Sequence, residues 1–244
     1  MSHRPSTPAG LAVAALAALL TGCGASDVVA KYAAISFEAV AEASKDRVAY
    51  AEQEAAWSLG SPGGDSIAFS SDFSRGPAEG KGSPIMDAPD IEMAFDLAPL
   101  AAAGLDPKRL PEPSGGDTVA YAVEDGTFMI HAELGNEAFP AEAAKSIEAT
   151  FAAILKTHRS AIGYHEKLDH YGIRLGGGNM FEWAKDLSKN DNDIVFVVDP
   201  APLVAAGLDP TKLSGGWLFA KVESKDRAGK AVFEDKLLRP FDLK

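Results

Sequence analysis

The densest group of side chains able to bind a metal or to transfer protons is His165-Glu-Lys-Leu-Asp169-His170. Imidazole nitrogens and carboxylate oxygens are zinc ligands, and a catalytic zinc site needs three of them. The two histidines are five positions apart, whereas the zinc-protease motif places them four apart on one helix face. We therefore expect a polar loop here. A metal-dependent hydrolase centred on His165, Asp169 and His170 is the alternative.

Cys23 is the only cysteine of the chain and therefore its only thiolate nucleophile. It ends the tetrapeptide Leu20-Thr21-Gly22-Cys23, which follows the unbroken apolar run Ala9–Leu20. This run is too short to span a bilayer, which takes about 20 apolar residues. Its length is typical of the apolar core of a cleavable export signal.

The tetrapeptide Leu20–Cys23 resembles the lipobox of bacterial lipoprotein precursors. The resemblance implies that residues 1–22 are removed and that Cys23 carries a diacylglyceryl group. Each buried methylene contributes about 0.8 kcal/mol, so two long acyl chains such as palmitate would hold the protein on a membrane. Gly24 rather than aspartate follows the cysteine, which implies the outer membrane where the envelope has two. We expect residues 23–33 to form a short tether.

The charge balance excludes some partners. The chain has 35 acidic against 23 basic residues, a net charge of −12. Nucleic-acid binding depends on basic residues that neutralise phosphates, so we expect no nucleic-acid partner. The glycines at 176–178 lack the spacing of a dinucleotide fingerprint, and no Gly-x-Ser-x-Gly elbow is present. The sequence therefore predicts no cofactor and no catalytic residue.

A phrase of thirteen residues occurs twice. Ala98–Leu110 (APLAAAGLDPKRL) and Ala201–Leu213 (APLVAAGLDPTKL) are identical at ten positions, with a constant offset of 103. A repeat of about 100 residues is too long for a solenoid unit and suits a duplicated small domain. We predict one copy in residues 34–135 and the other in residues 136–244.

Aspartates precede the phrase in both copies. Asp96 and Asp199 each follow an apolar stretch, and a carboxylate in this position can cap a helix by accepting from its first free N–H groups. Gly104 and Gly207 can take the left-handed conformation that ends a helix. We expect caps rather than ligands for a cation or an amine.

The elements around the phrase are expected in the same order in each copy. A long helix should come first, then a strand, a variable loop, the strand with its capped short helix, and a final pair of strands. This order predicts an α+β fold made of two tandem repeats. In each repeat a long helix would pack on an antiparallel sheet, and a pseudo-twofold axis would relate the repeats. The helices are expected at about 36–57 and 141–162, and the strand pairs at 118–124 with 127–134 and 217–223 with 231–238.

The segments between these elements differ between the copies. Residues 74–90 are rich in glycine, proline and serine and predict a long loop, whereas Asn179–Ser188 predicts a short amphipathic helix. Such a helix would pack on its own sheet or act as an aromatic lid. In the second case four of its side chains are the candidate ligand-binding residues: Met180, Phe181, Trp183 and Leu187.

These features together predict a lipid-anchored protein of the bacterial cell envelope. Its domain would be a non-enzymatic module that binds a small molecule, a lipid or an envelope protein. Binding would use a groove between the copies or the 179–188 helix. The hydrolase described above is one alternative, and a purely structural envelope protein is another.

Overall fold

The computed structural model describes residues 27–71, 89–114, 117–134, 145–166, 168–187, 192–225 and 231–243. The expected export signal, Cys23 and nearly all of the expected 74–90 loop lie outside these ranges. Among the described helices, none has the length and apolar character needed to cross a bilayer.

The described strands form two six-stranded antiparallel sheets with the same strand order. The first sheet has the order β1-β2-β3-β4-β6-β5, and the second has the order β7-β8-β9-β10-β12-β11. Together with the helices, they make the predicted α+β fold. The first sheet contains β1 (Val48–Ala51), β2 (Ala56–Gly60), β3 (Ser66–Ser70), β4 (Ile91–Asp96), β5 (Val119–Glu124) and β6 (Thr127–Ala132). The second contains β7 (Ile162–His165), β8 (His170–Gly176), β9 (Asn179–Ala184), β10 (Ile194–Val198), β11 (Leu218–Lys225) and β12 (Ala231–Phe241).

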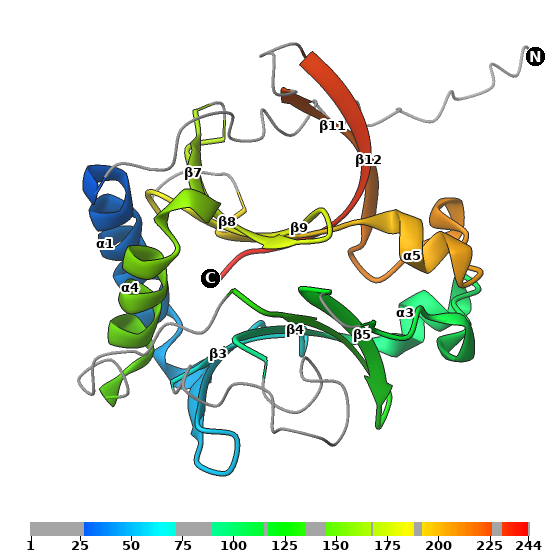
Figure 1. Cartoon of the computed structure of the whole chain (residues 1–244), viewed down its shortest axis with the longest axis horizontal. Coiled ribbons are helices and arrows are strands. Elements are labelled where there is room, and N and C mark those ends of the chain that lie inside the picture. The colour runs from blue at the N-terminus through cyan, green and yellow to red at the C-terminus, as the bar shows by residue number, and fades with distance from the viewer. Residues whose placement is uncertain are drawn as a thin grey trace, which may run out of the picture.

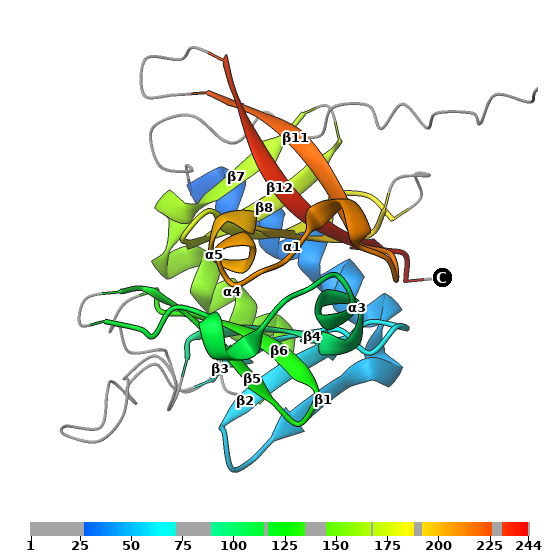
Figure 2. The same cartoon turned by 90° about the vertical axis from the view of Figure 1, so that its right-hand side faces the viewer.

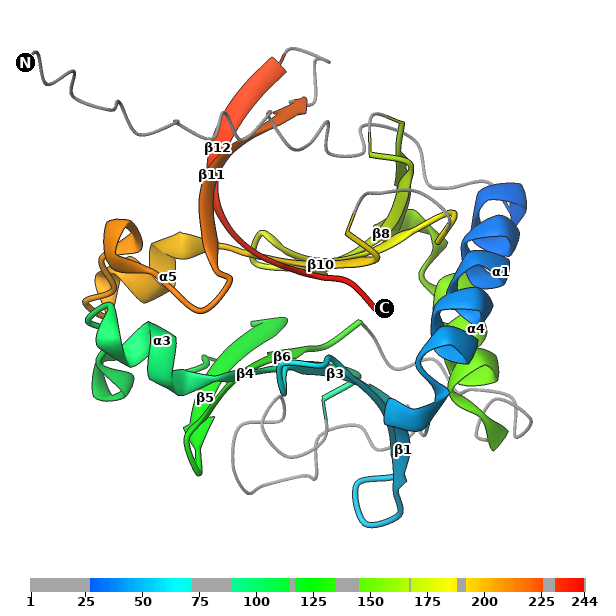
Figure 3. The same cartoon turned by 180° about the vertical axis from the view of Figure 1, so that it is seen from behind.

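Helices lie at both ends of the two stacked sheets (Figure 1). The long helices α1 (Asp27–Ala43) and α4 (Ile147–Thr157) are at one end, and the short helices α3 (Leu97–Ala102) and α5 (Pro200–Ala205) are at the other. Figure 3 shows the same order from behind. The helix expected at 36–57 is wrong in its bounds, because α1 starts at Asp27 and the chain enters β1 and β2 within that range. Residues 27–33 of the expected tether are therefore helical.

The core lies between the sheets. The rings of Phe95 in β4 and Phe196 in β10 meet edge to face across it, with centroids 5.1 Å apart. One apolar cluster contains buried side chains from both sheets and from all four α-helices. The two copies consequently share their main core.

The two long helices are exchanged between the copies. The main strand contacts of α1 are with β9 and β7 of the second sheet, and those of α4 are with β3 and β2 of the first. The Ser36 hydroxyl donates to the Ala184 carbonyl oxygen (2.7 Å), and the rings of Phe151 and Phe69 are 4.7 Å apart. The prediction that each long helix covers the sheet of its own copy is therefore wrong. Each helix makes its main strand contacts on the opposite sheet, while Phe37 of α1 also reaches Phe69 of the first sheet, with ring centroids 5.7 Å apart.

The repeated phrase forms the other end of the molecule. Asp96 accepts from the N–H of Ala98, and Asp199 accepts from the N–H of Ala201, so the predicted helix caps are confirmed. Gly104 and Gly207 have φ of +104° and +106°, the left-handed conformation expected where α3 and α5 end.

The phrases of the two copies contact each other reciprocally. The N–H of Asp106 donates to the carbonyl oxygen of Ala206 (2.9 Å), and the N–H of Asp209 donates to that of Ala103 (2.8 Å). A Cβ added to Gly104 would lie 2.8 Å from the carbonyl oxygen of Gly207, and the reverse distance is also 2.8 Å. This close approach of two backbones requires residues without side chains.

The closing hairpins are confirmed. β5 and β6 are joined by Asp125 and Gly126, with φ of +46° and +80°. Two positive φ values suit a tight turn whose twist matches that of the strands. The helix expected at Asn179–Ser188 is wrong, since residues 179–184 form β9 and all six are buried.

Candidate functional site

His165 and His170 are brought together by the structure. They are directly opposed in the β7–β8 pair, and both side chains are buried. Glu182 of β9 lies on the same face, with its Oε2 3.9 Å from Nδ1 of His170. Gly172 leaves room for it, because a Cβ there would lie 3.2 Å from Cγ of Glu182. These three side chains form an enclosed polar group within the second sheet.

Asp169 does not join this group. It lies in the β7–β8 turn with φ of +57°, where it accepts from the Tyr164 hydroxyl and pairs with Lys185 at 3.2 Å. Tyr164 alternates with His165 along β7, so its side chain is on the other face of the sheet. In the described part of the chain, no three His, Cys, Asp or Glu side chains are arranged to hold a metal ion.

The four candidate ligand-binding residues are separated by the sheet. Phe181 and Trp183 point into the core, while Met180 belongs to a small apolar cluster on the opposite face with Val195 and Val197. Leu187 is partly buried against the core. Trp183 is 0% exposed, and its indole N–H donates to the carbonyl oxygen of Ala33. Its ring therefore has no free face for a ligand in this structure.

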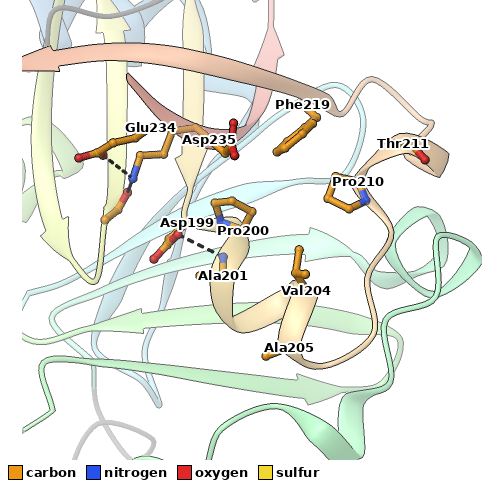
Figure 4. A pocket seen from close by; sticks show the side chains of 12 residues that line it. Asp199, Pro200, Ala201, Val204, Ala205, Pro210, Thr211, Phe219, Glu234 and Asp235 are labelled. Carbon is orange, nitrogen blue, oxygen red and sulfur yellow. Dashed lines mark hydrogen bonds and ion pairs between the residues drawn. The ribbon is translucent and has the colours of Figure 1, made fainter. Parts of the chain in front are cut away.

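A groove of about 990 Å³ lies between α5 and the β11–β12 hairpin (Figure 4). This volume is within the range of small-ligand sites, which are about 300–1,000 Å³. Val204 on one wall and Phe219 on the other are 46% and 44% exposed, so both present apolar surface to the groove. The lining consists of Gly178, Asp199, Pro200, Ala201, Val204, Ala205, Pro210, Thr211, Phe219, Glu234, Asp235 and Lys236.

The charged groups of the groove are mostly acidic. Its lining includes three carboxylates, from Asp199, Glu234 and Asp235, and one ammonium group, from Lys236. Lys236 is buried, and its Nζ lies 3.2 Å from Glu234 Oε2 and donates to the carbonyl oxygen of Gly178. Asp235 is paired as well, with its Oδ1 2.8 Å from Nζ of Lys221. Three carboxylates therefore stand beside two ammonium groups, which leaves the rim with a net negative charge of one.

The groove lies where the copies differ in length. The pair Phe95–Phe128 of the first sheet corresponds to Val198–Leu237 of the second. β6 begins one residue before Phe128, whereas β12 begins six residues before Leu237. Figure 2 shows the resulting β11–β12 hairpin extending beyond the rest of its sheet. The added length provides Glu234 and Asp235, which form part of one wall.

A smaller cavity of about 410 Å³ lies between the copies, with Val119 and Tyr121 from the first and Gly177 and Pro202 from the second. Burial raises the pKa of Tyr121, and the amide of Asn179 donates to its hydroxyl (3.5 Å). The cavity has no exposed large apolar side chain comparable to Phe219. The larger groove is consequently the better candidate for binding.

Comparison with protein-family models, with curated proteins and with solved structures finds nothing that matches the chain.

Proposed function

We propose that this protein is a lipid-anchored binding module of the bacterial cell envelope, with its ligand site in the groove between α5 and the β11–β12 hairpin. The main observation in favour of this ligand site is that Val204 and Phe219 are exposed on facing walls of the groove. Exposed apolar side chains in a concave site favour apolar ligands. The anchor is supported by the apolar run Ala9–Leu20 and by the lipobox that ends at Cys23.

The charge of the rim indicates which charge the ligand should carry. Glu234 is paired with Lys236 and Asp235 with Lys221, and the net negative charge that Asp199 adds favours a positive charge next to the apolar floor over an anion. The groove therefore suits an apolar chain or peptide segment that carries a positive charge, and it disfavours fatty-acid anions.

We propose further that a pseudo-twofold axis relates the copies and passes between Gly104 and Gly207. The common strand order, the mutual exchange of α1 and α4, and the reciprocal hydrogen bonds of Asp106 and Asp209 support this relation. An experimental structure with Asp96 and Asp199 in unlike settings would contradict it. Under this symmetry, the groove is a feature that the second copy acquired by lengthening its hairpin.

The anchor is tested by metabolic labelling with a palmitate analogue in a bacterial host. The wild-type chain is expected to take up the label and to fractionate with membranes. Cys23→Ser removes the only sulfur that can be acylated and should abolish labelling while the domain still folds. A labelled Cys23→Ser variant, or an unlabelled wild type, would refute the anchor.

The groove is tested by titration with Nile red, a neutral apolar dye, followed by displacement with decylamine or decanoate. Phe219→Ala should weaken dye binding by about tenfold, the loss of one aromatic anchor. Phe233→Ala is the matched control, because Phe233 is 61% exposed on the same hairpin but does not line the groove. Decylamine should displace the dye at lower concentration than decanoate. Equal losses in both variants would refute the ligand site and leave a structural envelope role.

A further inference from the structure

An apolar strip lies on the outward face of α1. Val28, Tyr32 and Ile35 are 60%, 56% and 49% exposed, and their spacing of four and three residues places them on one face of the helix. Ala39 continues the strip and is also exposed. Isolated exposed apolar residues are common, but a row along several turns indicates an interaction surface.

The strip is separate from the face that packs in the protein. The buried face of α1 contains Ala33, Phe37 and Val40, which pack in the shared core. α1 is thus apolar on two sides, whereas a helix at the surface of a globular protein usually has one apolar face. Folding of the chain accounts for the inner face and leaves the outer strip without a partner among the described residues.

The position of the strip restricts what can cover it. Only three residues separate Cys23 from Asp27, the first residue of α1. The four steps along the chain from residue 23 to residue 27 span at most about 14 Å when fully extended. If Cys23 is acylated, the first turn of α1 must lie within that distance of the lipid anchor, and Val28 is in that turn.

We propose that α1 lies along the membrane that holds Cys23, with Val28, Tyr32 and Ile35 inserted into the interfacial layer of lipid. This inference rests on the proposed acylation of Cys23. Tyrosine suits that layer, because its ring is apolar and its hydroxyl stays hydrated. The exposed charges around the strip are balanced, since Asp27 pairs with Arg159 and Glu42 pairs with Lys45, while Lys31 and Glu38 carry opposite charges. The contact is therefore apolar and does not depend on anionic lipid.

This orientation places the ligand groove away from the membrane. α1 and α4 lie at one end of the sheets, and α3 and α5 lie at the other (Figure 1). With α1 on the lipid, α5 and its groove face the aqueous side of the envelope. The anchor keeps the local concentration of α1 at the surface high, so a weak apolar contact is sufficient to fix the orientation.

The test uses the single-cysteine composition of the chain. Ile35→Cys introduces the only thiol that remains free after acylation of Cys23, and an NBD fluorophore is attached to it. Val204→Cys is the matched control, an apolar residue of similar exposure (46%) at the α5 end. Each mature lipidated protein is reconstituted into phosphatidylcholine vesicles that contain brominated phosphatidylcholine. The fluorophore at position 35 should be blue-shifted and quenched several-fold more strongly than the fluorophore at position 204. Adding phosphatidylglycerol should leave this difference unchanged.

The outcomes separate this inference from the lipid anchor. The mass of each reconstituted protein reports whether Cys23 carries acyl chains. With acylation confirmed, equal quenching at the two positions overturns the orientation of α1 and leaves the anchor intact. A blue shift at position 35 without quenching by brominated lipid overturns it also, because the strip would then be covered by protein. Absence of acyl chains in the mass refutes the anchor, and the orientation with it.

Discussion

The indole N–H of Trp183 in β9 donates a hydrogen bond to the carbonyl oxygen of Ala33 in α1, 3.3 Å away and 150 residues distant in the chain. This bond joins a helix of the first copy to a strand of the second. The rings of Phe37 and Phe151, which come from the two exchanged helices, lie beside it with centroids 4.0 Å apart. The centre of the core is therefore built from both copies.

Trp183→Ala should destabilise the fold strongly. The substitution removes a fully buried ring and its hydrogen bond, and such changes cost about 3–5 kcal/mol of unfolding free energy. Denaturant unfolding measures the loss, with Trp57→Ala as the control, since Trp57 is only partly buried and should cost less. Nile red affinity of the folded variant should remain at the wild-type value. A large loss of dye binding with little loss of stability would instead assign Trp183 to the ligand site.

Neither copy should fold alone. Residues 24–135 lack α4, which covers the first sheet, and residues 136–244 lack α1, which covers the second. Each fragment would leave the apolar face of its sheet in water, so size-exclusion chromatography should show aggregated or expanded chains. Co-expression of the two fragments should restore a complex with native circular dichroism. Cooperative unfolding of either isolated fragment would contradict a shared core.

Gly104→Ala should destabilise the protein more than Gly126→Ala. Both glycines have positive φ, which costs an alanine roughly 1–2 kcal/mol. A Cβ at position 126 has no atom within 4 Å, whereas at position 104 it meets the carbonyl oxygen of Gly207. The difference between the two unfolding free energies measures the contact between the copies. Equal losses would mean that the backbone segments around Gly104 and Gly207 can move apart without any loss of unfolding free energy.

Asp209 should titrate well below an ordinary aspartate. The Thr211 hydroxyl, the Lys212 ammonium and the N–H of Thr211 lower its pKa from 3.8 to about 2. Since the folded value lies below the unfolded one, the associated stability is present above pH 3.8 and is lost as the pH falls toward 2. Carbon NMR of the carboxyl group measures the midpoint. Thr211→Val should raise it, whereas Thr211→Ser, which keeps the hydroxyl, should not.

Local features were predictable from the sequence. The caps at Asp96 and Asp199, the left-handed glycines and the Asp125-Gly126 turn all depend on neighbouring residues, and the structure has each of them. Residues 179–184 were assigned to a helix wrongly. This strand is buried on both faces, so its apolar residues do not alternate with polar ones, and the pattern that distinguishes a strand from a helix is lost.

Features that depend on distant segments could not be predicted. The sequences of α1 and α4 do not indicate their exchange, because an apolar stripe does not specify which sheet it will cover. Only a weak indication of the groove is present in the sequence. Phe219 stands in a hairpin that runs longer than its counterpart, but its place in a groove depends on where α5 packs.

The exchange of the long helices has a consequence for how such a chain could arise. A protein with a single copy would have no helix over its own sheet, so it could be complete only as a pair of identical molecules, each lending its helix to the other. Joining the two genes would convert that dimer into one polypeptide. In the dimer, any change to a hairpin appears on both sides at once. The fused chain can lengthen one hairpin alone, and so can carry a single groove on a framework built for two.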